Sequence, residues 1–136
     1  MIYKVFKNNY NRKEFYSLVG KYFAEKKYKS KLKYLSNEDN YIWIIAIENN
    51  EAVGFTVFEE KKNLIIFDYT YSEIAAIEKE LLKRRFYLIK DINKAIKVDL
   101  LKKDCDIKYW LEKGFIITRE SKNYIFLRRE ARKSDR

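Results

Sequence analysis

The sequence predicts an α/β domain with a mixed, mostly antiparallel central sheet of about seven strands flanked by helices. Segments with apolar residues at every second position alternate with segments at helical spacing, in the order β-α-α-β-β-β-α-β-α-β-β. A chain of 136 residues, 47% hydrophobic and 17% aromatic, is long and apolar enough to bury a core. Three glycines and no proline leave no linker, so we expect one domain over residues 1–136 with a flexible tail at 131–136.

The N-terminal part of the chain predicts one strand and two helical pieces. The stretch "IYKVF" at 2–6 alternates and predicts the first strand. From Arg12 onward, apolar residues recur at the spacing of an amphipathic helix, and Asn11 precedes them as an N-cap. The stretch "KKYKSKLKYL" at 26–35 predicts a second, very basic helical piece. Its buried side is expected to carry Tyr28, Leu32 and Leu35.

The middle of the chain predicts three antiparallel strands followed by a long helix. Residues 41–71 contain three apolar runs, with turns expected at Asn49-Asn50 and at 61–63. Ser72 is the expected N-cap of a helix that runs to residue 93. The buried face of this helix is expected to carry Ile74, Ile77, Leu81, Leu88 and Ile92.

The C-terminal part predicts a strand, a short helix and a hairpin. The stretch "AIKVDLL" at 95–101 reads as a strand, and "CDIKYWLEK" at 105–113 reads as a helix. Gly114 follows that helix, where a glycine can adopt the left-handed conformation and end it. Phe115 is then expected to enter the core at the start of a hairpin over 115–130.

The composition limits the chemistry. The chain has no histidine and one cysteine, Cys105, so we expect no internal disulfide, no metal site and no histidine base. Only general basic charge lowers the pKa of Cys105, so we do not expect a nucleophile there. No apolar run approaches the roughly 20 residues needed to span a bilayer, and the start does not resemble a signal peptide, so we expect a cytoplasmic protein without a membrane partner. The formal net charge of +10 favours an acidic partner, although a lysine-rich bias of the coding DNA also accounts for it.

Two stretches and one spacing carry a resemblance to a known superfamily. They are the hairpin "NNEAVGFTVFE" at 49–59, the stretch "IKVDLLKKDCDIKYWLEKGFII" at 96–117, and the spacing from Leu81-Leu82 to Val98. Together with the element order, they resemble the GNAT superfamily of acyl-CoA-dependent N-acetyltransferases. The resemblance implies acetyl-CoA as cofactor and transfer of an acetyl or acyl group to an amine, which a small molecule, a protein or DNA provides.

A longer stretch has a narrower likeness. Residues 14–55 are similar to the front half of a group of bacteriophage GNAT-like proteins, in which an aromatic first helix with a Gly-x-x-Phe step precedes an acidic loop and a tryptophan-bearing strand. Some phage relatives, those of the Mom type, modify DNA bases. The resemblance therefore also leaves open DNA base modification, or a non-catalytic module of this fold that binds nucleic acid or protein.

The stretch before the central helix is where the resemblance implies cofactor binding. Members of the superfamily hold the pyrophosphate of acetyl-CoA on backbone amides of a glycine-containing loop at the start of this helix. The resemblance assigns this role to Tyr69, Thr70, Tyr71, Ser72, Glu73 and Ile74. The stretch contains neither glycine nor arginine, and the carboxylate of Glu73 in the first helical turn repels a phosphate.

In one interpretation Ser72 and free amides of Glu73 and Ile74 still bind the phosphate. Lys79 or Arg84 would then compensate the charge. In the other, the cofactor site is lost and the fold serves binding.

The resemblance also implies proton-transfer residues. Asp68, expected at the end of the fourth strand, is the first candidate for the base. Glu59 and Glu60 are further candidates, but adjacent strand residues point to opposite faces, so only one of them can serve. Tyr109 lies one residue before Trp110. Trp110 occupies the place where many members of the superfamily carry a tyrosine that acts as the general acid. Tyr109 is therefore a candidate proton donor, with simple packing as the alternative.

A basic stretch favours nucleic acid as the alternative partner. Five lysines are interleaved with two tyrosines between residues 26 and 34. The lysines are Lys26, Lys27, Lys29, Lys31 and Lys33. Lysines neutralise phosphates while aromatic rings stack on unpaired bases. The alternative is a solvated surface whose tyrosines reach into the core.

Overall fold

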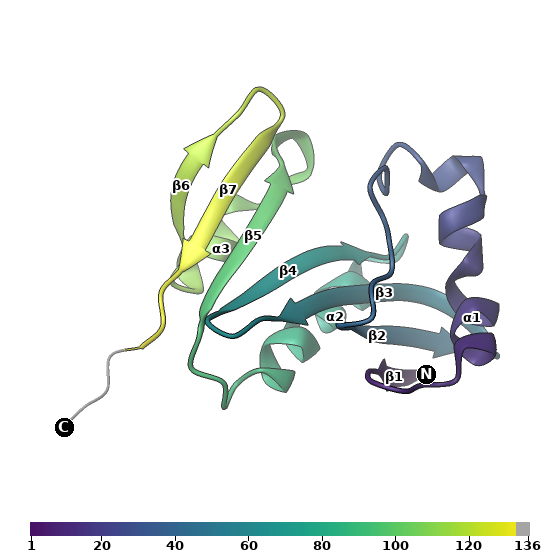
Figure 1. The fold of residues 1–136 in the computed structure, drawn as a ribbon. Coiled ribbons are helices and arrows are strands. Elements are labelled where there is room, and N and C mark those ends of the chain that lie inside the picture. The colour runs from purple at the N-terminus through teal and green to yellow at the C-terminus, as the bar shows by residue number, and fades with distance from the viewer. Residues whose placement is uncertain (133–136) are drawn as a thin grey trace. The chain divides into compact units, whose positions relative to one another are not determined.

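A computed structural model describes residues 1–132, apart from the side chain of Asp104. The elements in these residues are β1 (Ile2–Phe6), α1 (Arg12–Ala24), the 3-10 turn η1 (Lys26–Tyr28), β2 (Tyr41–Glu48), β3 (Glu51–Glu60), β4 (Leu64–Tyr71), α2 (Ala75–Leu88), β5 (Ala95–Leu101), the 3-10 turn η2 (Lys102–Asp104), α3 (Ile107–Glu112), β6 (Ile116–Glu120) and β7 (Tyr124–Arg129) (Figure 1). Of the tail predicted at 131–136, residues 133–136 lie outside the described part. None of the described helices has the length and apolar character needed to cross a membrane.

The strands form a mixed sheet, which confirms the predicted α/β class. Hydrogen bonds connect them in the order β1-β2-β3-β4-β5-β7-β6. β1 is antiparallel to β2, and β7 is antiparallel to both β5 and β6. β4 and β5 run parallel, with pairs from Leu64 beside Ala95 to Phe67 beside Val98.

The chain divides into two compact units. The first unit contains residues 1–58 and 69–89, and the second unit contains residues 59–68 and the chain from residue 90 onward. β4 therefore contributes its beginning to the second unit and its last three residues to the first.

In the first unit, β2 and β3 contact a helix on each face, because successive strand residues point to opposite sides (Figure 1). On one face, a core cluster contains Phe15, Leu18, Val19 and Tyr22 of α1 with Trp43, Ile45, Phe55 and Val57 of the strands. On the other face, Ile77 and Leu81 of α2 pack with Ile44 and Ala46 of β2. Asn11 caps α1 as predicted, since its side chain accepts a hydrogen bond of 3.1 Å from the Glu14 N–H.

The helix predicted at 26–35 is wrong in extent. Only the single turn η1 forms, and turns and irregular backbone follow it. Five like charges within the eight residues from Lys26 to Lys33 disfavour a regular helix. The predicted buried side is right, because Tyr28 and Leu32 are each 5% exposed and join the core. We call residues 26–34 the lysine segment.

α2 is shorter than predicted, and one of its buried positions is charged. It begins at Ala75 with Ile74 as N-cap, not at Ser72, and it ends at Leu88 instead of residue 93. Ile74 is 49% exposed and Leu88 is 38% exposed, so these two predicted core positions are wrong. Arg85 completes the buried face instead, and its guanidinium donates a hydrogen bond of 3.1 Å to the Val57 carbonyl. The apolar stem of an arginine can line a core when its polar end finds such an acceptor.

In the second unit, α3 ends as the sequence predicts. Gly114 has φ +91°, in the left-handed region. The Gly114 N–H donates to the Leu111 carbonyl at 3.1 Å, and the Phe115 N–H donates to the Trp110 carbonyl at 3.2 Å. These bonds form a Schellman motif, and the ring contact between Trp110 and Phe115 at 5.1 Å is the apolar contact that accompanies it. Phe115 is 2% exposed, so it enters the core as predicted.

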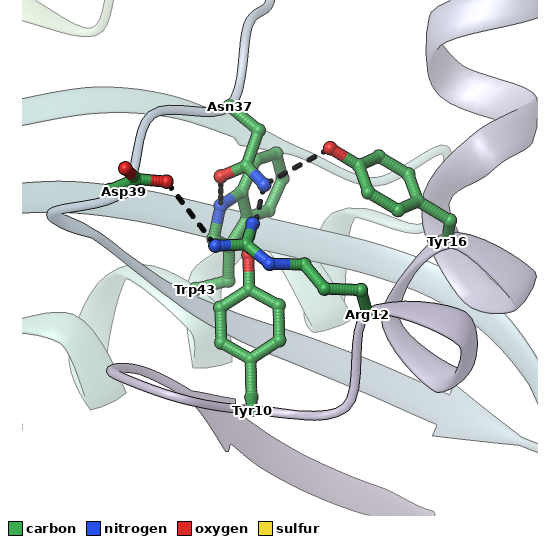
Figure 2. A network of polar contacts seen from close by, with 6 residues as sticks. All are labelled: Tyr10, Arg12, Tyr16, Asn37, Asp39 and Trp43. Carbon is green, nitrogen blue, oxygen red and sulfur yellow. Dashed lines mark hydrogen bonds and ion pairs between the residues drawn. The ribbon is translucent and has the colours of Figure 1, made fainter.

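A polar network fixes the chain between the lysine segment and β2. Figure 2 shows the amide of Asn37 between three aromatic side chains. Asn37 donates to the hydroxyls of Tyr10 at 2.9 Å and Tyr16 at 3.2 Å, and it accepts from the indole N–H of Trp43 at 2.9 Å. Arg12 adds contacts to the Tyr10 hydroxyl at 3.0 Å and to the Asp39 carboxylate at 3.3 Å. These bonds attach the chain before β2 to α1 and to the loop that precedes α1.

Candidate functional site

The connection between β4 and α2 is a tight bend built around Ser72. Tyr69, Thr70 and Tyr71 belong to β4, so the bend contains only Ser72, Glu73 and Ile74. The Ser72 side chain is buried; its hydroxyl donates to the Val53 carbonyl at 2.7 Å and accepts from the Ile74 N–H at 3.1 Å. The first interpretation of the sequence expected a free Ile74 amide. This expectation is wrong, because the Ile74 N–H donates to the Ser72 hydroxyl.

Gly54 on β3 makes room for this bend. A Cβ atom at Gly54 would lie 2.8 Å from the Tyr71 carbonyl oxygen, 2.9 Å from Ser72 Cβ and 3.1 Å from Leu81 Cδ1. The first two of these atoms belong to the bend and its strand, which cannot withdraw like the end of a flexible side chain. The glycine in the hairpin at 49–59 thus has a physical reason, since only glycine permits this close approach.

The N-terminus of α2 is exposed and has no side-chain cap. Glu73, Ile74, Ala75 and Ala76 are all exposed, and the N-cap Ile74 has no side chain that can accept a hydrogen bond. The first N–H groups of a helix have no partner within the helix. The amides of Ala75 and Ala76, with the positive end of the helix dipole, are therefore available to an anion. The carboxylate of Glu73 opposes such binding.

An aromatic cluster lies beside the bend. The ring of Tyr71 contacts the rings of Tyr22 and Tyr28 at centroid distances of 5.8 and 5.6 Å. Burial, and then the neighbouring charge of Glu73, raise the pKa of Tyr71 to about 12. The pKa of Lys27 is raised by a hydrogen bond with Tyr28 and, more weakly, by Glu73. Because Tyr28 contacts Tyr71, whose hydroxyl donates to the Glu73 carboxylate at 3.4 Å, the lysine segment lies beside the bend that precedes α2.

The six residues assigned to the cofactor are contiguous in the first unit, and two of them fix neighbouring segments. The Tyr69 hydroxyl accepts a hydrogen bond from the Tyr34 N–H at 3.2 Å. The Thr70 hydroxyl bonds the buried Thr56 hydroxyl at 2.7 Å. A role of the six residues toward a cofactor stays a prediction. The sequence interpretation missed the Ala75 and Ala76 amides because it started the helix at Ser72, and no sequence signal marks the later start.

The predicted catalytic residues lie in the second unit. Asp68 is inside β4 instead of at its end, and it is the residue that follows the last parallel pair, Phe67 with Val98. Glu59 forms an ion pair of 4.0 Å with Lys61. Their roles stay predictions.

Two further side chains of the second unit bear on proton transfer. The ring of Tyr109 contacts the buried Trp110 at 5.4 Å, and the ammonium of Lys113 lies 5.5 Å from the centre of the Tyr109 ring. Burial and the neighbouring Asp106 raise the pKa of Cys105, which disfavours its thiolate. No group of three or more Asp, Glu or Cys side chains suited to a metal ion occurs in the described part of the chain.

Comparisons with known proteins support the fold. No family model matches the chain, and no curated protein sequence matches it. Solved structures do match. An acyl-CoA N-acyltransferase from Pseudomonas aeruginosa matches with a TM-score of 0.74 and 12% identity over 94% of this chain and 98% of that one. Escherichia coli ElaA matches with a TM-score of 0.70 and 12% identity over 95% of this chain and 100% of that one. A PaiA N-acetyltransferase from Thermoplasma acidophilum, solved in complex with coenzyme A, matches with a TM-score of 0.58 and 13% identity over 96% and 99%. The chain therefore has the GNAT fold that its sequence resemblance implied.

Proposed function

We propose that this protein is an acyl-CoA-dependent N-acyltransferase whose α2 N-terminus receives the diphosphate of the cofactor. The observation that carries the proposal is the exposed, uncapped start of α2 directly after β4, in a chain whose fold matches solved N-acyltransferases. The lack of glycine in the bend does not oppose the proposal, because Gly54 on β3 leaves the space that the bend needs to pack closely against that strand.

The residues present fit a phosphate group in part. The amides of Ala75 and Ala76 supply donors at the positive end of the helix dipole. Lys27 supplies a positive charge that the bend itself lacks, since its ammonium lies 5.0 Å from the centre of the Tyr28 ring and that ring contacts Tyr71. When bound, an acyl-CoA supplies a thioester whose acyl group passes to an amine with release of the thiol. Glu73 weakens phosphate binding, so we expect a lower affinity than an uncharged residue would give.

The proton-transfer roles follow from the side chains that the chain contains. A protonated amine must lose a proton before it can attack, and a carboxylate can take this proton in a chain without histidine. We assign this role to Asp68, with Glu59 as the alternative, and we assign proton donation to the released thiol to Tyr109. The acceptor amine belongs to a small molecule, a protein or DNA.

Binding of acetyl-CoA tests the proposal directly. Titration calorimetry should give a measurable dissociation constant, and acetyl-CoA at about 100 times that constant should raise the free energy of unfolding by roughly 2.7 kcal/mol. Absence of both effects would refute the proposal. It would favour a non-catalytic module of the same fold. The carboxylate of Glu73 beside the start of α2 also favours that alternative, because it repels a phosphate.

Two substitutions test where the diphosphate binds. Ala75→Pro removes one N–H at the first helical position, where proline is tolerated, and Ile74 already has the extended backbone that precedes a proline (φ −106°, ψ 113°). The variant should stay folded and bind acetyl-CoA about tenfold more weakly, because a hydrogen bond to a charged group is lost. Glu73→Gln should tighten binding about threefold by removing the repulsion. Acetyl-pantetheine, which lacks the diphosphate, is the control ligand whose affinity should not change in either variant.

An activity assay separates catalysis from binding. Thiol release from acetyl-CoA should depend on an added amine, and Asp68→Asn should lower kcat while the dissociation constant of acetyl-CoA stays within about twofold of the original. An unchanged kcat would transfer the base role to Glu59, which Glu59→Gln tests in the same assay.

A further inference from the structure

The lysine segment concentrates five positive charges within eight residues. All five of its lysines, Lys26, Lys27, Lys29, Lys31 and Lys33, are exposed. Some lysines elsewhere pair with carboxylates, as Lys94 does with Glu60 at 2.6 Å and Lys97 with Asp99 at 3.8 Å. Within residues 1–132, none of the five forms an ion pair within 4.0 Å. The segment itself contains no acidic residue, so the positive charge is concentrated along it.

The backbone of the lysine segment is nevertheless held in place. Tyr28 and Leu32 are each 5% exposed, and Tyr28 contacts Tyr22 at a ring distance of 4.8 Å. The Leu32 N–H donates to the Tyr28 carbonyl at 2.8 Å, and the Tyr34 N–H donates to the Tyr69 hydroxyl at 3.2 Å. A charged surface that is already ordered loses less entropy when it binds a partner.

Tyr34 adds an aromatic surface to this charge. It is 66% exposed, in contrast to the buried Tyr28, and the ammonium of Lys33 lies 5.4 Å from the centre of its ring. Lysines beside an exposed ring are what proteins use to bind unpaired nucleotides, since the ring stacks on a base while the ammonium groups contact phosphates.

We propose that the lysine segment, with Tyr34, binds single-stranded nucleic acid through the phosphate backbone and one stacked base. The choice of nucleic acid over an acidic protein rests on the exposed Tyr34 ring, and the choice of single strands rests on the need for an unpaired base. The inference does not depend on acyl transfer.

Fluorescence anisotropy with a labelled oligothymidylate of about 20 nucleotides tests the charge. The variant K29Q/K31Q/K33Q leaves Lys26 and Lys27 in place and removes three charges. Its affinity at 100 mM salt should fall by at least about tenfold. The slope of log affinity against log salt should become shallower by about 2, since each phosphate contact on a single strand contributes about 0.7.

A matched control removes the same charge elsewhere. The variant K13Q/K62Q/K122Q also removes three lysines that are exposed and form no ion pair within the described residues. It should lose less than about threefold in affinity. Equal losses of affinity in the two variants would show that only net charge matters and would overturn the proposal. Absence of oligothymidylate binding by the unsubstituted protein at 50 mM salt would also overturn it.

A second pair of variants tests stacking. Tyr34→Ala should weaken single-strand binding by about tenfold, within the 1–3 kcal/mol typical of a stacked base, and should leave binding to a duplex of the same length unchanged. Tyr87 on α2, also 66% exposed, supplies the control Tyr87→Ala, which should change neither. Equal weakening on both probes, or no weakening, would contradict the stacked base. Displacement of the oligonucleotide by poly-glutamate at equal charge would make the partner an acidic polypeptide and overturn the choice of nucleic acid.

Discussion

The β4–α2 connection and the α3–β6 connection both join a helix to a strand in very little chain, but they place glycine differently. After α3, Gly114 is itself the turning residue, with φ +91°. Before α2, the bend of Ser72, Glu73 and Ile74 has no glycine, and the residue that makes it feasible is Gly54 on the neighbouring strand.

The difference separates two physical uses of glycine. At Gly114 the backbone dihedral demands it, whereas at Gly54 the space for a side chain is missing. A search for glycine within the connection finds the first use and misses the second. The absence of glycine between Tyr69 and Ile74 is therefore weaker grounds for loss of a phosphate site than the sequence alone suggested.

The largest expected effect is that of filling the space at Gly54. Gly54→Ala should lower the free energy of unfolding by about 3 kcal/mol, because its Cβ would meet the Tyr71 carbonyl oxygen at 2.8 Å. Chemical denaturation measures this. Gly20→Ala in α1 is the control, since nothing lies within 4 Å of its Cβ, and it should stabilise by about 0.7 kcal/mol through helix propensity. A neutral Gly54→Ala would show that the bend can move away from β3.

The next effect comes from the hydroxyl that closes the bend. Ser72→Ala should cost about 2 kcal/mol, because the Val53 carbonyl and the Ile74 N–H each lose a buried partner. Ser17→Ala is the matched control on α1; its exposed hydroxyl bonds the Glu14 carbonyl, and the change should stay within about 0.5 kcal/mol. If both variants unfold at the same denaturant concentration, the Ser72 hydroxyl does not hold the bend.

A smaller effect is expected at the other connection. Gly114→Ala should cost about 1 kcal/mol, because alanine is strained at φ +91° while its Cβ would meet only the flexible Arg129 side chain, at 3.3 Å. Gly114→Asn should cost less, since asparagine tolerates positive φ, as Asn49 and Asn50 do in the β2–β3 turn. Equal losses for alanine and asparagine would point to crowding by Arg129 instead of backbone strain.

The smallest effect is expected from Tyr71 at alkaline pH. Its pKa is raised from 10.0 to about 12, so the folded protein holds this proton more tightly than the unfolded chain. The contribution of this hydroxyl to the free energy of unfolding is complete below pH 10 and is lost as the pH rises toward 12. In Tyr71→Phe the decline of stability over this range should be shallower, although not absent, because burial also raises the pKa of Tyr22. Solvent screens the partly exposed Tyr71, so the difference is small. Identical declines in denaturation midpoints from pH 9 to 11.5 would exclude a contribution from this hydroxyl.

Most of the fold could be predicted from local patterns. The three apolar runs in residues 41–71 and the turn at Asn49-Asn50 located β2, β3 and β4, because strand and turn signals act over a few residues. Asn11 and Gly114 were recognised because caps act within a few residues of the chain.

The errors have tertiary causes. The lysine segment has the apolar spacing of a helix, yet charge repulsion leaves it only one turn while Tyr28 and Leu32 still reach the core. Ser72 has the composition of an N-cap, but the Val53 carbonyl on the neighbouring strand takes its hydroxyl. Arg85 is buried because the Val57 carbonyl on a strand accepts a hydrogen bond from its guanidinium, which no pattern on α2 itself predicts. At the candidate site, the sequence placed residues 69–74 between a strand and the central helix, as the structure has them, and their role stays a prediction. The amides of Ala75 and Ala76 could not be predicted, because tertiary contacts decide where the helix begins.

The two tryptophans of the chain give the molecule an internal optical readout. Trp43 is fully buried in the first unit, with its indole N–H on Asn37, and Trp110 is 5% exposed in the second unit against Phe115. Each unit therefore has one tryptophan of its own. In Trp110→Phe, the tryptophan emission comes only from Trp43 of the first unit. In Trp43→Phe, it comes only from Trp110 of the second unit. Red shifts on denaturation would then report for each unit separately whether it loosens, and a ligand that orders only one of them would move only one of the two spectra.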